Sequence, residues 1–219
     1  MVAIVQGTSD SGFKNHCSGT IISKNFVLTA AHCFDNPNSA DSLYLILGSD
    51  DLQEDQENQF YRVERDIERT YIHPKYQKEF HYFDLALIKI DIPLDFSAGI
   101  LPICLPKQAI ADVDSRPNDG VTLAGYGAIS SSDQSNSQLR FTHLNIYAQV
   151  YCNDSYTTSG RIGQRIRTAL PNKFQSDLLC AGYEVKSISN KFKFFQMFFF
   201  RLLVKDLAWE TLEVHLSPT

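Results

Sequence analysis

Residues 27–33 of this chain read Val-Leu-Thr-Ala-Ala-His-Cys, an apolar run followed by two small residues, an imidazole and a thiol. The apolar start is typical of a short buried strand. Ala30 and Ala31 allow a tight turn of the backbone after it, and a bond from Cys33 to Cys17 across a hairpin would fix where the His32 imidazole points. Most histidines have no chemical role, but this setting makes His32 a candidate functional residue.

A second candidate, Asp84, follows an aromatic residue and opens the apolar run Leu85–Ile90. A carboxylate at the mouth of a buried strand is costly to desolvate unless it is hydrogen-bonded. A general-base imidazole needs such a carboxylate to hold its Nδ1 proton and to stabilise the imidazolium. We therefore expect the side chains of His32 and Asp84 to face each other.

The first half of the chain consists of short apolar runs separated by loops rich in Asn, Asp, Ser and Pro. Strands are predicted at Gly19–Ile22, Phe26–Thr29, Leu43–Leu47 and Leu85–Ile90, and a further one begins at Val121. Many short strands with turn signals between them indicate an antiparallel barrel or sandwich rather than βαβ units. The first five residues look like a strand entered in its middle, without the features of a secretory signal, so we expect residues to be missing in front.

Composition narrows the function classes. The 219 residues carry a net charge of -5 and are 43% hydrophobic, which is the balance of an ordinary globular protein. A mildly acidic chain without a Lys/Arg block is a poor electrostatic match for nucleic acid or for anionic lipid. The longest apolar run, Phe194–Val204, is interrupted by polar residues and is too short to span a bilayer. We therefore expect neither nucleic acid nor membrane as a partner.

The cysteines give a further constraint. There are five, and none forms a Cys-x-x-Cys pair, so no zinc or redox motif is visible. Five is an odd number. If the protein contains disulfides, one cysteine has lost its partner.

The order of the motifs resembles that of the trypsin-like serine proteases over residues 1–184. The motifs are Cys17–Ile22, Leu28–Cys33, Ile72–Tyr76, Asp84–Ile88, Pro102–Pro106, Ala124–Gly127 and Leu179–Tyr183. The resemblance implies an all-β fold of two antiparallel six-stranded barrels, the first over about 1–110 and an incomplete second over about 119–184. It also implies proteolysis outside the cell by a monomer, on polypeptide substrates or with polypeptide inhibitors, and without a cofactor.

The resemblance assigns roles to particular residues. His32 would be the general base and Asp84 its orienting carboxylate. Disulfides are implied for Cys17–Cys33 and Cys152–Cys180, while Cys104 is left unpaired because the pro-segment that holds its partner in many relatives is absent here. Relatives often bind calcium in a loop that here contains five acidic residues: Asp50, Asp51, Glu54, Asp55 and Glu57. Ser49 stands where a glutamate ligand is usual, which favours a solvated loop over a metal site.

One departure from the family pattern outweighs the matches. The family nucleophile is the serine of Gly-Asp-Ser-Gly-Gly-Pro, and this motif does not occur in the chain. The nucleophile, its oxyanion-hole amides, the specificity pocket and the last strands of the second barrel are therefore expected to be missing, and the chain to be inactive. Two alternatives stay open: a non-catalytic homologue acting as a binding or regulatory module, and a mis-spliced product that does not fold.

The tail, residues 185–219, offers an explanation. Residues 185–205 are rich in Lys, Phe, Leu, Ser, Ile and Asn, with no period of two or of 3.6. If the codons for Trp209–His215 are read from their third bases, permitted choices give Gly, Asp, Ser, Gly, Gly and Pro. We therefore interpret the tail as translated intron followed by the serine exon in the wrong frame.

Overall fold

The computed structural model describes residues 1–7, 12–36, 43–53, 60–80, 82–105, 120–127, 137–148, 150, 179–182, 184–185, 193–194 and 198–200, and for the last three of these segments only the backbone. Within these residues the regular structure is β, apart from one 3-10 turn, η1 (Ala31–Phe34), and the single helical residue Val150. The all-β fold class expected from the sequence is confirmed.

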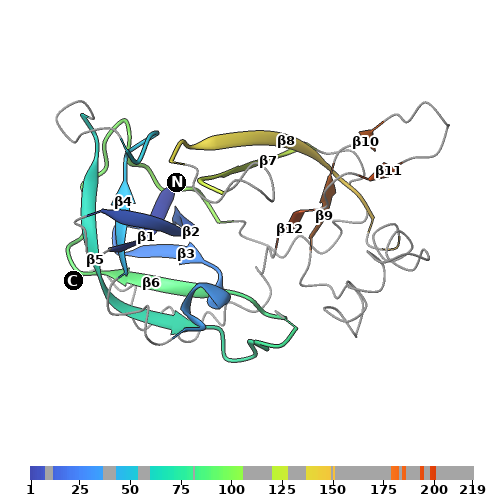
Figure 1. The fold of residues 1–219 in the computed structure, drawn as a ribbon, viewed down its shortest axis with the longest axis horizontal. Coiled ribbons are helices and arrows are strands. Elements are labelled where there is room, and N and C mark those ends of the chain that lie inside the picture. The colour runs from blue at the N-terminus through green and yellow to red at the C-terminus, as the bar shows by residue number, and fades with distance from the viewer. Residues whose placement is uncertain are drawn as a thin grey trace. The chain divides into compact units, whose positions relative to one another are not determined.

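The first six strands form a closed antiparallel barrel (Figure 1). In chain order they are β1 (Val2–Gly7), β2 (Phe13–Ile21), β3 (Phe26–Thr29), β4 (Leu43–Leu47), β5 (Val63–Ile72) and β6 (Ala86–Ile90). Their order around the barrel is β1-β2-β3-β6-β5-β4. Closure pairs every strand on both sides and removes the exposed edges that an open sheet would present. This barrel is the one that the resemblance implies for the first half of the chain.

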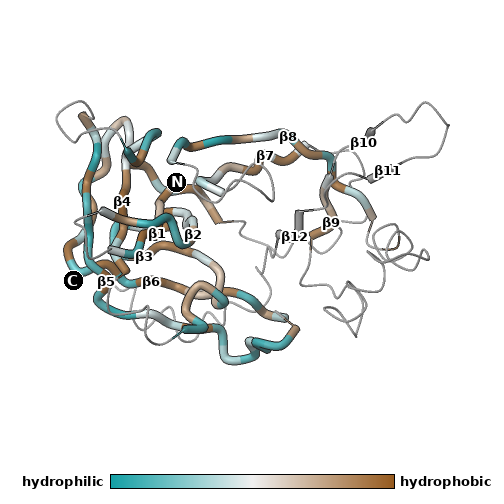
Figure 2. The backbone as a smooth tube through the Cα atoms, in the orientation of Figure 1, coloured by the Kyte–Doolittle hydropathy of each residue, from teal (hydrophilic) through white to brown (hydrophobic). Residues whose placement is uncertain are grey.

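Strand β1 shows why its sequence is apolar without interruption. Val2 and Ile4 belong to a cluster that fills the barrel interior, together with Leu45 of β4 and Ile88 of β6. The alternate residues, Ala3 and Val5, belong to a second cluster that also contains Tyr126. Because successive side chains of a strand point to opposite faces, β1 is buried on both of them. Strand β5 differs, since half of its residues are charged, and it is largely hydrophilic in Figure 2.

A partial second sheet follows in the chain. It contains β7 (Gly120–Gly125), β8 (Arg140–Ile146), β9 (Leu179–Gly182) and β12 (Phe198–Phe200), in the order β12-β9-β8-β7. The short strands β10 (Glu184–Val185) and β11 (Lys193–Phe194) pair with each other. Contacts divide the chain into two units, residues 1–104 with 122–142, and residues 105–121 with 143–219.

The tail contributes to this second region. Sequence periodicity predicts no strand in residues 185–205, yet β11 lies there, and β12 pairs with β9 through Phe199 and Cys180. No helix among the described residues combines the length and apolar character that crossing a membrane requires.

Candidate active site

The position of His32 follows from the way β3 ends. Ala30 keeps an extended conformation, with φ −88° and ψ 145°, and η1 begins at the next residue. The turn is closed where the backbone N–H of Asp35 donates to the carbonyl of His32, at 3.2 Å. The small side chain of Ala31 is buried beneath the turn, whereas His32 is exposed. The tight turn thus buries Ala31 and exposes the next residue, His32.

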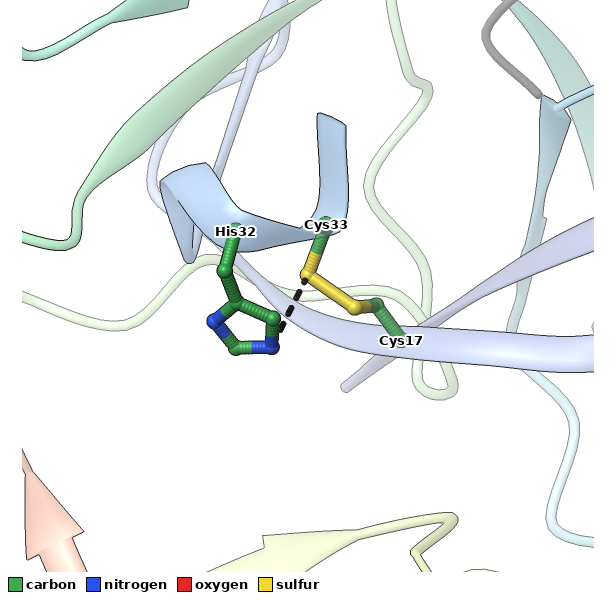
Figure 3. A group of neighbouring side chains, drawn as sticks. All are labelled: Cys17, His32 and Cys33. Atoms are coloured by element: carbon green, nitrogen blue, oxygen red, sulfur yellow. Dashed lines mark hydrogen bonds between the residues drawn. A yellow bond between two sulfur atoms is a disulfide. The ribbon is translucent and has the colours of Figure 1, made fainter. Parts of the chain in front are cut away.

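Strand β2 holds the turn on its other side. Cys17 and Cys33 form a disulfide, with their Cα atoms 6.2 Å apart (Figure 3). Nε2 of His16 donates to the carbonyl of Cys33 at 2.6 Å, and the hydroxyl of Thr29 donates to the carbonyl of Ser18 at 2.9 Å. The backbone on both sides of His32 is thus attached to β2. His16 is a contributor that the sequence did not single out.

Cys17, His32 and Cys33 place one nitrogen and two sulfur atoms within 4.8 Å of one another. Nε2 of His32 lies 4.0 Å from Sγ of Cys33, as the dashed line in Figure 3 marks. Metal ions bind the thiolate form of cysteine, and here the two sulfur atoms are bonded to each other. With the disulfide intact, this trio has no thiolate to offer a metal.

Asp84 lies in the hairpin between β5 and β6 and contacts His32 with both carboxylate oxygens. Oδ1 accepts the backbone N–H of His32 and Oδ2 accepts from Nδ1, each at 2.8 Å. Because an ionised carboxylate only accepts hydrogen bonds, Nδ1 carries the proton and Nε2 becomes the basic nitrogen. The Asp84 side chain is 14% exposed against 48% for His32, so the imidazole presents a face to solvent while its partner is shielded.

The electrostatics of the pair favour the protonated imidazole. The hydrogen bond that Nδ1–H of His32 donates to Asp84 raises the pKa of His32, burial opposes this, and the charges of Asp84 and Asp35 raise it further. The folded-state pKa therefore lies above the ordinary value of 6.5. Stabilisation from this pair is fully present below that ordinary pKa and is lost as the pH rises through the higher folded-state pKa.

The family model described as Trypsin matches residues 1–191. The chain belongs to the trypsin family. Two relatives are serine protease filzig and serine proteinase stubble of Drosophila melanogaster, each 31% identical, over 170 and 182 residues. These alignments cover 78% and 82% of this chain but only 9% and 21% of the two proteins. The venom peptide isomerase heavy chain of Agelenopsis aperta is 29% identical over 186 residues, 85% of this chain and 71% of that protein.

Only some of the other site residues predicted for this trypsin-family chain lie among the described residues. Cys104 is free and exposed. Cys180 is disulfide-bonded, but Cys152 lies outside the described residues, so their pairing stays a prediction. In the acidic loop, hydrogen bonds from the backbone N–H of Gln53 and from neighbouring side chains lower the pKa of Asp51. Asp50 is exposed, and the other three acidic residues of that loop, Glu54, Asp55 and Glu57, lie outside the described part of the chain.

Tyr126 contacts both strand β2 and the segment that follows β4, which its sequence motif does not reveal. Its hydroxyl donates to the carbonyl of Ser49 at 2.5 Å, and its backbone N–H donates to Oγ of Ser18 at 3.1 Å. Burial, with a smaller contribution from the charge of Asp50, raises the pKa of Tyr126 to about 12. The hydroxyl therefore stays protonated and keeps donating throughout the neutral range.

Replacing Asp84 with asparagine is expected to lower the pKa of His32 toward its ordinary value. The substitution keeps the size of the side chain, but it removes the negative charge and replaces one of the two acceptor oxygens with an NH2 donor, so imidazolium is no longer favoured. In the wild-type chain, the free energy of unfolding should fall as the pH rises through the raised pKa of His32. In the variant, this fall should be largely absent. NMR titration of the His32 ring, with unfolding curves on both sides of pH 6.5, measures both effects. An unchanged His32 pKa would contradict the electrostatic role given to Asp84.

Proposed function

We propose that this chain carries the general-base half of a serine endopeptidase site. Nε2 of His32 would take the proton of a nucleophilic hydroxyl, while Asp84 keeps the ring in the required tautomer and stabilises the imidazolium. The observation that carries this proposal is the double contact of Asp84 with the ring and the backbone of His32. The names of the relatives, which include serine proteases and a peptide isomerase, support polypeptides as the substrate class.

We infer further that the 219-residue chain does not complete the reaction. The sequence contains no Gly-Asp-Ser-Gly-Gly-Pro. Without the serine no acyl-enzyme forms, and an imidazole with no hydroxyl to deprotonate contributes little to catalysis. The shifted codons of Trp209–His215 support a loss at the level of the transcript, since their fixed bases are compatible with the complete motif.

Labelling with a fluorophosphonate probe tests both statements. The 219-residue chain should remain unlabelled. A frame-restored chain, in which residues 185 to about 205 are removed and the exon that follows is read in the shifted frame to its own stop codon, should react. The same chain with alanine at the serine of the restored motif is the matched control and should not react. Labelling of the 219-residue chain would contradict the inferred inactivity, and an unreactive but folded frame-restored chain would contradict the endopeptidase proposal.

A second candidate function is a non-catalytic binding or regulatory module. It is favoured by the site residues themselves, because the barrel closes and the His32–Asp84 pair forms without any serine motif in the chain. In this case the unlabelled 219-residue chain would still be folded and would bind a polypeptide partner. A folded, unlabelled chain that shows no binding to polypeptide protease inhibitors of the family would argue against this role.

We also propose an extracellular setting, a monomeric state and a covalent partner segment for Cys104. The thiol of Cys104 is exposed, and the neighbouring side chains of Leu101 and Ile103 are 62% and 59% exposed. An exposed thiol flanked by exposed apolar side chains suits a disulfide-linked peptide that would cover this segment.

A further inference from the structure

Phe83, the residue before Asp84, has an unusual backbone conformation. Its φ is +53°, and it is the one non-glycine residue with positive φ in the described part of the chain. Such a conformation is unfavourable for a bulky side chain and persists only where the surroundings compensate for it. The N–H of Leu85 donates to the carbonyl of Phe83 at 2.8 Å, which closes a three-residue turn with Asp84 at its centre. The left-handed residue therefore sets the direction in which Asp84 leaves the chain.

Two side chains from the opposite arm of the hairpin hold the Phe83 ring. The imidazole of His73 stacks on it, with ring centroids 5.3 Å apart and planes inclined by 8°. The ammonium of Lys75 lies 5.4 Å from the centroid of the same ring. Aromatic stacking and cation–π attraction both stabilise this arrangement. We call His73, Lys75 and Phe83 the Phe83 clamp.

His73 is itself firmly placed, so it can act as a support. It is buried, and its backbone N–H donates to the carbonyl of Leu85 at 2.9 Å, which continues the pairing of β5 with β6 by one residue. Its Nδ1 accepts the backbone N–H of Lys75 at 3.2 Å. The clamp thus joins the two arms of the hairpin directly beside the turn that presents Asp84.

We propose that Phe83 is a positioning residue for Asp84. The clamp compensates for the strained backbone, and the resulting turn points the carboxylate so that it reaches both Nδ1 and the backbone N–H of His32. An aspartate side chain is short, so the direction of its backbone decides whether both contacts form. This inference rests on the role proposed for Asp84, and it concerns how that role is prepared by the fold.

The test compares substitutions in the full 219-residue chain by NMR of the His32 ring. Phe83→Leu removes the stacking but keeps an apolar side chain, and should lower the pKa of His32 and speed the exchange of its Nδ1 proton. Phe80→Leu is the matched control, because it removes an aromatic ring from the same hairpin outside the clamp. It should leave both quantities at their wild-type values. The His32 signal is assigned as the one that disappears in His32→Gln.

A second pair of variants separates positioning from stability. His73→Phe keeps an aromatic face for stacking and should stay close to wild type in both readouts, whereas His73→Ala should resemble Phe83→Leu. Lys75→Gln, at an exposed position, should also speed the exchange of the Nδ1 proton. If Lys75 acted on His32 through its charge alone, its removal would raise the pKa of His32. We expect no such rise. Among the described residues, the charges of Asp84 and Asp35 both raise the pKa of His32.

The outcomes are decisive in both directions. A lower melting temperature in Phe83→Leu and His73→Ala, with the His32 pKa and exchange rate unchanged, would make the clamp merely structural and overturn the proposal. If Phe83→Leu does not fold, the His73 pair and Lys75→Gln decide the question. Neither readout requires turnover, so a failure of the clamp would leave the labelling result expected for the proposed function untouched.

Discussion

Replacing His32 with alanine in the frame-restored chain is expected to lower kcat for a peptide substrate by roughly 10⁶. The substitution removes the group proposed to take the proton of the serine and to return it to the leaving group. Removal of any one member of a nucleophile–base–carboxylate unit costs nearly as much as removal of the whole unit, because the members act together. The measurement is steady-state hydrolysis of a peptide substrate, with kcat and KM determined separately.

Two further variants bracket this result. Asp84→Asn should lower kcat by about 10⁴, since it leaves the imidazole in place but removes the charge and puts an NH2 donor in place of one of the two acceptor oxygens, which favours the wrong tautomer. His143→Ala, an exposed histidine on β8 with no role in the proposed chemistry, is the control and should leave kcat close to that of the parent. A His32→Ala variant that retains substantial activity would mean that another group serves as the base.

Removal of the Cys17–Cys33 disulfide, as the Cys17→Ser/Cys33→Ser double variant, is expected to lower the free energy of unfolding by about 3 kcal/mol. The two cysteines are 16 residues apart in the sequence, and releasing a loop of this size gives the unfolded chain more conformational freedom. The loss should also loosen η1, because the disulfide is one of the bonds that attach this turn to β2. Urea-induced unfolding at equilibrium gives the magnitude.

The free cysteine provides the matched control for this variant. Cys104→Ser changes an exposed thiol with no disulfide partner and should alter the free energy of unfolding by less than about 0.5 kcal/mol. If the double variant were as stable as Cys104→Ser, the turn at His32 would be held by the hydrogen bonds of His16 and Thr29 rather than by the disulfide.

The strands that the sequence predicted well are those buried on at least one face. The predicted ranges Phe26–Thr29 and Leu43–Leu47 coincide with β3 and β4, and Leu85–Ile90 contains β6. Strand β5, Val63–Ile72, was not predicted, although it is the longest in the barrel. It places only Val63 and Ile67 against the interior cluster, and charged side chains fill most of its other positions. Its stability comes from backbone pairing with β4 and β6, which leaves little trace in hydrophobicity.

The residues of the candidate site also fall into those that the sequence predicted and those that it did not. His32 and Asp84 could be proposed from local chemistry, because each has unusual neighbours in the sequence. The contribution of His16 could not, since it depends on a carbonyl 17 residues away. Nor could that of Tyr126, whose backbone bonds to a serine 108 residues earlier. The clamp was also hidden, because a phenylalanine gives no sign that its backbone is left-handed.

The sequence by itself determined the residue types, their order and the family, and with these the identity of the candidate base and its carboxylate. Only the tertiary structure decided that both oxygens of Asp84 reach His32 across a separation of 52 residues. The physical reason is that a hydrogen bond requires both the right distance and the right direction. Here the direction is set by a closed barrel, a disulfide and a strained turn, whose parts come together only when the chain has folded.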